Sequence, residues 1–233
     1  MTTPTGPAAD ARPASPIDDE ETIARPEGEP GPVPREARGG SGTGRYEIRD
    51  RIGAGGMGTV STAWDRQLRR EVAVKALRLE LVGDTLARGQ FTEEAVILAG
   101  LDHPGAVPVY ETGDLADGRP FCAMKRVRGV TLGVLLLGRS PDSLRSREDL
   151  AHLVGVFERV CQTVAAAHDR GIVHRDLKPD NVMVDDLGAV YVMDWGLAFS
   201  ASPEGASRVS TPSPGEIAGT PSYMAPEQAR GRA

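Results

Sequence analysis

Hydrophobic and polar positions alternate over residues 46–64, where the first regular pattern of the chain begins. Residues at every second position share one face of two expected strands: Tyr46, Ile48, Asp50 and Ile52, then Val60, Thr62 and Trp64. A period of two is typical of β-strands. The pattern therefore predicts a hairpin whose turn lies in the glycine-rich segment GAGGMG, residues 53–58.

A buried strand and a helix are predicted next. Residues 71–77 read EVAVKAL, in which Lys75 stands between apolar neighbours. Residues 91–101 read FTEEAVILAGL, and their apolar positions recur at helical spacing. This spacing puts Glu94 (or Ala95) on the inward face of the helix and Glu93 toward solvent.

The longest predicted helix follows Ser146. Ser146 is a suitable N-cap, and Asp149 three residues later completes a capping-box pattern with Asp in place of Glu or Gln. Gly171 suits the C-terminal cap. One face of this helix carries Leu150, Leu153, Val154, Phe157, Cys161, Val164 and Ala165.

The first 44 residues have a different composition. Pro, Gly, Ser, Asp and Glu dominate there, and large apolar residues are nearly absent. Such a segment buries too little surface to offset the entropy of ordering the chain. We therefore expect a mobile tail over 1–44, with the fold beginning at about Tyr46.

Composition narrows the class of protein. A chain of 233 residues with 39 % hydrophobic residues fits one large domain or two small lobes. No apolar run approaches the roughly 18–20 residues of a membrane span, and the N-terminus lacks a signal-peptide pattern, so a cytoplasmic protein is expected. The net charge of −6 weighs against nucleic acid as the main partner.

The two cysteines point to no metal site or disulfide framework. Cys122 and Cys161 lie in apolar segments, far from any metal-ligand spacing. We therefore expect both to be reduced thiols in the core.

The glycine-rich segment suggests phosphate binding. Gly53, Gly55 and Gly58 match G-x-G-x-x-G, but a dinucleotide site needs a helix after the glycines, and here they turn a hairpin. The backbone N–H groups of such a turn could lie over the phosphates of a nucleotide. A glycine-rich hairpin without a ligand remains the alternative.

Lys75 also has two interpretations. It either extends to an edge of the sheet or meets an anion and a carboxylate inside. Glu94 is the candidate carboxylate, and an ordinary surface acid is the alternative.

Two later segments concentrate polar chemistry beside apolar runs. Residues 172–184 read IVHRDLKPDNVMV and crowd polar side chains into positions 174–181, among them His174, Arg175, Asp176, Lys178 and Asn181. Polar groups so close to a core are costly unless they bind something. Residues 190–198 read VYVMDWGLA and place Asp194 at the end of a strand-like run.

Together these segments resemble a eukaryotic-type serine/threonine protein kinase of the kind also found in bacteria. The matching motifs occur in the family's order over residues 46–233: IGAGGMGTV, VAVK, HRDLKPDN, MDWG and GTPSYMAPE. The resemblance implies an α+β, bilobal fold. A small β-rich N-lobe would occupy 45–127, and an incomplete, mostly helical C-lobe would occupy 128–233.

The resemblance also implies ATP and Mg²⁺ as cofactors and protein Ser/Thr hydroxyls as substrates. Lys75 would hold the α- and β-phosphates and be oriented by Glu94, while Asn181 and Asp194 would hold Mg²⁺. The remaining catalytic roles fall to Asp176, which would accept or orient the hydroxyl proton, and Lys178, which would neutralise charge on the transferred phosphoryl group.

The implied nucleotide site is built around the hairpin and the strands that follow it. Val60, Ala73 and Met183 would sandwich the adenine, the backbone of 125–127 would meet its edge, and Met124 would guard the pocket behind it. The full implied set is Ile52, Gly53, Ala54, Gly55, Gly56, Met57, Gly58, Thr59, Val60, Ala73, Lys75, Met124, Lys125, Val127 and Met183.

Regulation and substrate docking are implied by the following segment. Arg175 resembles the arginine that pairs with a phosphorylated activation loop, and Thr211 and Ser213 lie where family members are often phosphorylated. Thr220 is expected to hydrogen-bond near Asp176 and Lys178. Trp195 stands where the family usually has phenylalanine and should fill an apolar slot near Leu98, Val109 and His174.

The chain departs from the family pattern at its end, six residues after Glu227. Family members continue for several helices, so the apolar face of the helix at about 148–168 should be partly uncovered, and a completing chain or a second copy could cover it. One alternative is a nucleotide-binding but catalytically impaired fragment that acts as a regulatory or scaffold partner. Another is a small-molecule phosphotransferase, which GTPSYMAPE disfavours.

Overall fold

A computed structural model describes residues 44–139, 146–200 and 217–231 of the chain. The expected tail lies outside the described residues except for Gly44, and so do Thr211 and Ser213. All of the described residues belong to one compact unit. The division into lobes at residue 127 therefore stays a prediction.

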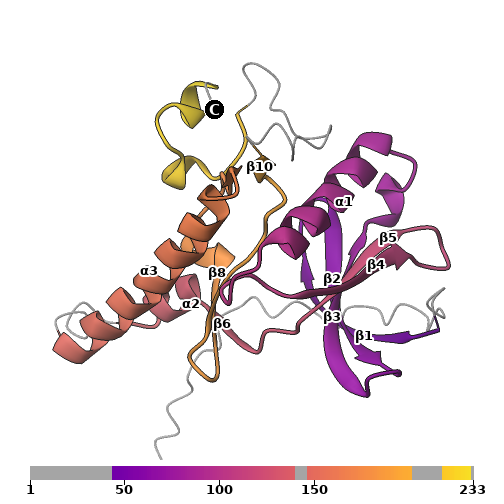
Figure 1. Cartoon of the computed structure of the whole chain (residues 1–233), viewed down its shortest axis with the longest axis horizontal. Helices are drawn as coiled ribbons and strands as arrows, with labels where there is room; N and C mark the ends of the chain where they lie inside the picture. Colours follow the sequence, from indigo (N-terminus) through magenta and orange to yellow (C-terminus); the bar gives the residue numbers. More distant parts are fainter. Residues whose placement is uncertain (1–43, 140–145, 201–216, 232–233) are drawn as a thin grey trace, which may run out of the picture. The chain divides into compact units, whose positions relative to one another are not determined.

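A five-stranded antiparallel sheet forms the first part of the fold (Figure 1). Its strands are β1 (Tyr46–Ala54), β2 (Gly58–Asp65), β3 (Arg70–Leu77), β4 (Val109–Asp114) and β5 (Pro120–Met124), in the order β1-β2-β3-β5-β4. The predicted hairpin is confirmed, because Gly55 N–H donates to the Gly58 carbonyl at 2.8 Å between β1 and β2.

The inward face predicted for β1 is largely wrong. Tyr46 is buried, but Ile48, Asp50 and Ile52 are exposed. The strand lies at the edge of the sheet, and its register with β2 shifts between Ile48 and Gly53. An edge strand with such irregularities does not keep one face on the core.

The helix α1 (Thr85–Gly100) packs against β4 and β5. It begins at Asp84, whose side chain accepts hydrogen bonds from the backbone N–H groups of Leu86 and Ala87. The expectation that Glu93 points to solvent is wrong, because Glu93 is as buried as Glu94 at 8 % exposure. The buried face of α1 is wider than one stripe and includes residues 93, 94, 95, 97 and 98.

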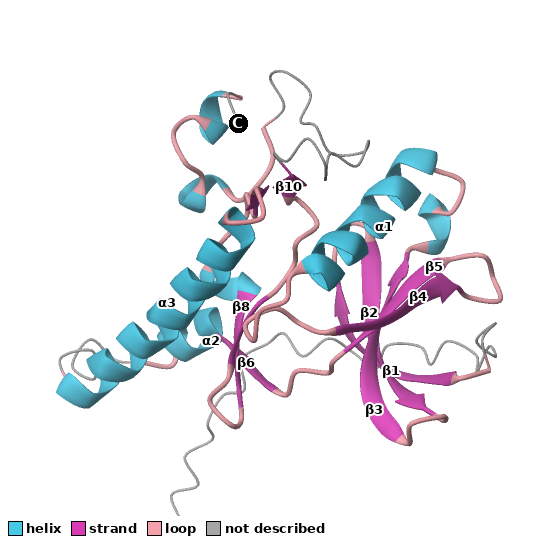
Figure 2. Cartoon of the chain, in the orientation of Figure 1, coloured by secondary structure: helices cyan, strands magenta, loops and turns pink. Residues whose placement is uncertain are grey.

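The second part of the described chain, which follows β5, is built from helices and short strands (Figure 2). Its helices are α2 (Leu132–Leu137) and α3 (Arg147–His168), and its strands are β6 (Gly129–Thr131), β7 (Ile172–Val173), β8 (Val182–Asp185), β9 (Val190–Val192) and β10 (Phe199–Ser200). β6, β8 and β9 form one small sheet, and β7 pairs with β10. Short 3₁₀ turns occur at Leu79–Leu81, Pro179–Asn181, Pro221–Tyr223 and Gln228–Arg230.

The predicted N-cap of α3 is confirmed, whereas its C-cap is Asp169 and Gly171 lies two residues beyond it. The Ser146 side chain accepts a hydrogen bond from Asp149 N–H, and Gly171 adopts a φ of +70° while its N–H donates to the His168 carbonyl. A positive φ at this position suits glycine, which has no Cβ to clash.

The buried face of α3 differs from the predicted one. The residues buried there are Val156, Val160, Thr163 and Ala167. The predicted stripe lies largely outside, with Leu150, Val154 and Phe157 55 %, 56 % and 66 % exposed, so the expectation of a partly uncovered apolar face is confirmed. Cys161 lies on this exposed stripe, which corrects its expected place in the core, whereas Cys122 is buried.

One continuous core cluster joins the two parts. It contains Ala73 and Leu98 from the first part together with Val160 and Val192 from the second. Gly105 lies at the junction, where its carbonyl accepts a hydrogen bond from Val192 N–H at 2.9 Å. A Cβ on Gly105 would fall 1.9 Å from Thr163 Oγ1, so a larger residue does not fit against α3.

Within the described ranges, none of the helices combines the length and the apolar character that crossing a membrane requires.

Candidate functional site

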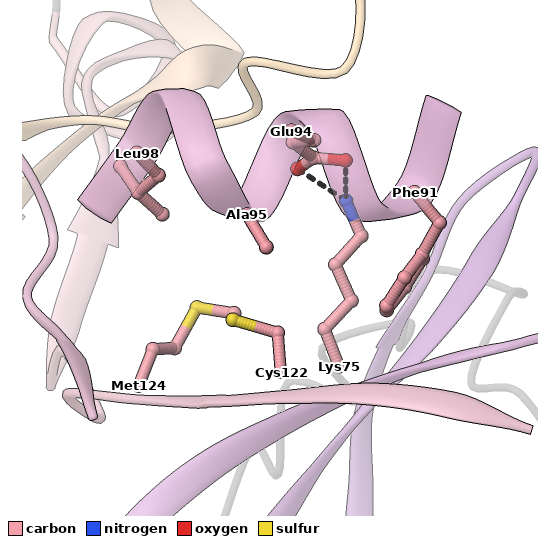
Figure 3. A pocket seen from close by; sticks show the side chains of 7 residues that line it. All are labelled: Lys75, Phe91, Glu94, Ala95, Leu98, Cys122 and Met124. Carbon is pink, nitrogen blue, oxygen red and sulfur yellow. Dashed lines mark hydrogen bonds and ion pairs between the residues drawn. The ribbon is translucent and has the colours of Figure 1, made fainter. Parts of the chain in front are cut away.

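Lys75 and Glu94 form an ion pair between β3 and α1 (Figure 3). The Lys75 ammonium lies 2.5 and 2.6 Å from the two carboxylate oxygens, and both side chains are mostly shielded from solvent. The predicted pairing is therefore confirmed, and the alternatives of a lysine at a sheet edge and a surface acid are excluded. A shielded ion pair contributes little to stability by itself, so this pair is a candidate functional site.

A small pocket lies next to this ion pair (Figure 3). Its lining consists of Lys75, Phe91, Glu94, Ala95, Leu98, Cys122 and Met124. Met124 is thus placed at a pocket, as its expected guarding role requires. Burial raises the pKa of Cys122 to about 12, so this thiol stays protonated and unreactive.

The glycine hairpin lies directly on Lys75. A Cβ on Gly58 would come 3.0 Å from the Ala76 carbonyl and 3.5 Å from Lys75 Cε, so a side chain at this position would crowd β3. The segment expected to cover the phosphates therefore lies beside the ammonium expected to bind them.

Three predicted site residues converge around Gly196. A Cβ placed on Gly196 would lie 3.3 Å from Asp194 Oδ1, 3.3 Å from Glu94 Oε2 and 3.6 Å from Met57 Cε. The hairpin tip, the ion pair and the candidate metal ligand thus meet at one point, although they are far apart in sequence.

Asp176 is the centre of a second cluster. Lys178 Nζ donates to Asp176 Oδ2 at 2.8 Å, and Thr220 donates to Oδ1 from both its backbone N–H and its hydroxyl at 2.8 Å. Lys178 also donates to Thr220 Oγ1 at 2.7 Å. The predicted hydrogen bonding of Thr220 is confirmed.

The environment of Asp176 keeps its carboxyl group ionised. Burial raises the pKa, but the hydrogen bonds from Lys178 and Thr220, together with the Lys178 charge, outweigh it and lower the pKa below its usual value. At neutral pH the group is a carboxylate that can accept a proton or a hydrogen bond.

Asn181 and Asp194 provide oxygen donors that fit Mg²⁺. The Asn181 amide nitrogen donates to the Asp176 carbonyl at 2.8 Å, which turns the side-chain oxygen the other way. Met193 N–H donates to the Asn181 carbonyl at 2.7 Å and so brings the end of β9 alongside. Asp194 follows with a φ of +55° and an exposed side chain.

The small number of protein donors is itself compatible with this ion. The described residues contain no group of three or more His, Cys, Asp or Glu side chains that could hold a metal. Mg²⁺ usually takes only one or two protein ligands and completes its shell with water and phosphate oxygens. The residues present therefore fit Mg²⁺ bound together with a nucleotide.

Trp195 anchors the turn that carries Asp194. Its ring is 1 % exposed and lies 4.6 Å from the His174 ring, and its Nε1–H donates to the Val192 carbonyl at 3.1 Å. Leu98 belongs to the same core cluster, and Val109 packs against that cluster. The predicted contact with His174 is confirmed, while direct contacts with Leu98 and Val109 stay predictions. The slot also satisfies the indole N–H that phenylalanine lacks.

The expected adenine side is arranged in part as predicted. Val60, Ala73, Met124 and Val127 belong to or pack against one core cluster. Lys125 N–H donates to the Pro108 carbonyl, whereas the Lys125 carbonyl and Val127 N–H make no hydrogen bond within the described ranges. Met183 is half-buried opposite Tyr191 on β9, outside that cluster, so its contact with adenine stays a prediction.

Sequence patterns missed the partner of Lys125. Its ammonium hydrogen-bonds the Tyr191 hydroxyl and lies 4.6 Å from the centre of the ring. This contact joins the segment after β5 to Tyr191 on β9. A lysine and a tyrosine 66 residues apart leave no local pattern that could have predicted their contact.

Arg175 connects the two active-site segments. Its Nε–H donates to the Leu197 carbonyl at 2.5 Å, and its guanidinium lies 6.0 Å from the Phe199 ring. Its expected pairing with a phosphorylated loop stays a prediction, since Thr211 and Ser213 lie outside the described residues.

The fold and these clusters define a protein kinase, and comparison with known families agrees. Residues 46–233 match the protein kinase domain family, and the chain belongs to that family. Serine/threonine-protein kinase PknD of Chlamydia caviae is 38 % identical over 205 residues, which cover 80 % of this chain and 22 % of that protein. PknD of Chlamydia trachomatis serovar L2b is 37 % identical over 210 residues, with the same coverage.

Both relatives are bacterial proteins named as serine/threonine-protein kinases, and the chain is similar to this part of them. The chain spans about a fifth of the length of the curated relatives it matches.

Proposed function

We propose that the chain transfers the γ-phosphate of ATP to Ser or Thr hydroxyls of proteins and requires Mg²⁺. The observation that carries this proposal is the convergence of Met57, Glu94 and Asp194 around Gly196, next to Lys75. Positioning and charge neutralisation account for most of the catalysis of phosphoryl transfer, and these residues supply both.

Lys75 would bind the α- and β-phosphates, with Glu94 fixing the position of its ammonium. Asn181 and Asp194 would hold Mg²⁺. When bound, this ion would neutralise negative charge on the phosphate oxygens. The free carbonyl of Lys125 and N–H of Val127 suit the edge of adenine, which presents both a donor and an acceptor.

The substrate hydroxyl would be held by Asp176. The hydroxyl oxygen would form the new bond to the γ-phosphorus while the bond from phosphorus to the β,γ-bridging oxygen breaks. The hydroxyl proton would pass to the Asp176 carboxylate. Lys178 would stabilise the negative charge on the transferred group. Thr220, bonded to both residues, would form part of the surface that receives the peptide.

The proposal includes predictions that rest on the family resemblance. Phosphorylation of Thr211 or Ser213 would bring negative charge to Arg175. The division into lobes at 45–127 and 128–233 and the cytoplasmic location belong to the same proposal. The exposed apolar stripe on α3 favours one second candidate, a nucleotide-binding fragment that is catalytically impaired until a partner covers the stripe.

Transfer of ³²P from γ-labelled ATP to a generic Ser/Thr protein substrate tests the proposal. We expect Mg²⁺-dependent incorporation that falls by at least about 100-fold in Asp176→Ala and in Asp194→Ala, because each variant loses a group on the reacting atoms. Phosphopeptide mapping should find label between residues 207 and 213. Mg-ATP binding without transfer would select the impaired fragment, and transfer only to small alcohols would select a small-molecule phosphotransferase.

A further inference from the structure

Gln228 is a buried polar residue that no role described above uses. It begins the 3₁₀ turn Gln228–Arg230 and is 9 % exposed. Its amide nitrogen donates to two backbone carbonyls, those of Arg175 and Ala218, each at 2.6 Å. One side chain thus links the peptide that leads into Asp176 with the segment that leads into Thr220.

The backbone on both sides of this link has an uncommon conformation. Arg175 has a φ of +65°, which is unusual for a residue with a side chain, and Gly219 has a φ of +122°. A Cβ on Gly219 would lie 2.8 Å from the Gln228 amide nitrogen and 2.9 Å from the Arg175 carbonyl. Gly219 therefore lies directly beside the hydrogen bond that joins Gln228 to the Arg175 carbonyl.

The link and the Asp176 cluster support each other. Thr220 follows Gly219 and donates twice to Asp176 Oδ1, so the two segments are joined on both sides of the Gly219 peptide. A primary amide suits this place because its NH₂ group has two hydrogens for two carbonyl acceptors. A carboxylate of the same shape has none.

We propose that Gln228 is a positioning residue, which holds the backbone before Asp176 and the segment 218–220 in one fixed arrangement. This inference rests on the proposed function, because Asp176 and Thr220 must then face the same substrate hydroxyl. Gln228 donates its side-chain hydrogen bonds to Arg175 and Ala218, and neither is expected to bind the nucleotide. Its loss should therefore slow transfer to peptide while leaving ATP binding intact.

Two variants of the full chain test this proposal, with Gln162→Met as a control on the exposed surface of α3. We expect Gln228→Met and Gln228→Glu to lower kcat for peptide phosphorylation about tenfold to a hundredfold, the loss typical of slight misplacement of reacting groups. The KM for ATP should stay within about twofold of the wild-type value, because the phosphate-binding residues are elsewhere. Gln162→Met should change neither quantity.

The pH profile separates positioning from a general loss of structure. In Gln228→Glu a carboxylate would face two carbonyl oxygens, which favours its protonated form. Once protonated it can donate one hydrogen bond, so activity relative to the wild type should rise as the pH falls from 8 to 6. Gln228→Met should show no such recovery. Because glutamate keeps the shape of glutamine, this variant also serves if the methionine variant fails to fold.

The possible failures can be told apart. If the wild type transfers phosphate and both Gln228 variants transfer it equally fast, the positioning role is wrong and the proposed function stands. If the wild type transfers none, the proposed function fails, and hydrogen exchange of the Thr220 amide tests the link by itself. That amide should exchange faster in Gln228→Met than in Gln162→Met, and equal protection would overturn the inference.

Discussion

His174 uses both ring nitrogens in ways that only a neutral imidazole allows. Nε2 lies 2.9 Å from the Met193 carbonyl and donates to it, while Nδ1 accepts the Asp176 N–H at 3.3 Å. Its ring also lies against Trp195. A proton on Nδ1 would remove the acceptor for Asp176 N–H. The protonation state of His174 therefore affects the geometry of the segments that carry Asp176 and Met193.

The burial of His174 makes the stability of the fold depend on pH. Burial lowers the pKa of His174 below its ordinary value of about 6.5, and the hydrogen bond to Met193 with the nearby Asp194 and Asp176 charges only partly opposes this. Between the pKa of His174 in the folded protein and its higher pKa in the unfolded chain, the unfolded chain binds more protons. Stability therefore rises with pH over this range. The contribution is fully present above about pH 6.5 and is lost as the pH falls toward the folded-state pKa.

Thermal unfolding of the wild type and His174→Gln between pH 8 and pH 5 measures this contribution. The advantage of the wild type should shrink on acidification, whereas His152→Gln, an exposed histidine on α3, should follow the wild type. Parallel curves for the wild type and His174→Gln would contradict a neutral buried imidazole.

Single residues were the part of the site most open to prediction from sequence. Lys75, Asp176, Asn181 and Asp194 lie in short motifs whose spacing is nearly independent of the rest of the fold. Gln228 and the contact of Lys125 with Tyr191 could not be predicted in this way, because their partners come from distant segments. Such contacts arise from packing, which leaves no period in the sequence.

At the scale of elements, α3 shows what periodicity can and cannot determine. Its start follows from a local signal, the predicted Ser146 cap, and the positive φ of Gly171 lies just beyond its C-cap, Asp169. Its buried face depends on its neighbours. Gly105 contacts Thr163, which lies outside the apolar stripe that the sequence predicted as the buried face. Thr163 can be buried because its hydroxyl donates to the Arg159 carbonyl at 2.9 Å.

A pair of glycine substitutions tests this contact. Gly105→Ala should destabilise the chain by about 1–3 kcal/mol, since its Cβ would overlap Thr163 Oγ1. Gly155→Ala, within α3 and with open space around it, should instead stabilise by about 0.4–1 kcal/mol, because alanine favours the helix. Denaturant unfolding of both variants gives the two values. A neutral Gly105→Ala would show that 105–107 does not pack tightly against α3.

At the scale of the whole molecule, the residues expected to handle the nucleotide come from both parts of the chain. Lys75 lies on β3, Glu94 on α1 and Met57 in the turn between β1 and β2, whereas Asp194 follows β9. The core cluster that includes Ala73, Leu98 and Val192 joins these parts and so positions the groups around Gly196. Nucleotide affinity should therefore need the ion and both parts together.

Titration calorimetry with ATP, in Mg²⁺ and then in excess EDTA, measures this dependence. We expect binding in Mg²⁺ that weakens at least about tenfold in EDTA, with the same weakening in Asp194→Ala even when Mg²⁺ is present, because the carboxylate and the ion act as one unit. Equal affinity with and without Mg²⁺, or wild-type affinity in Asp194→Ala, would contradict this expectation.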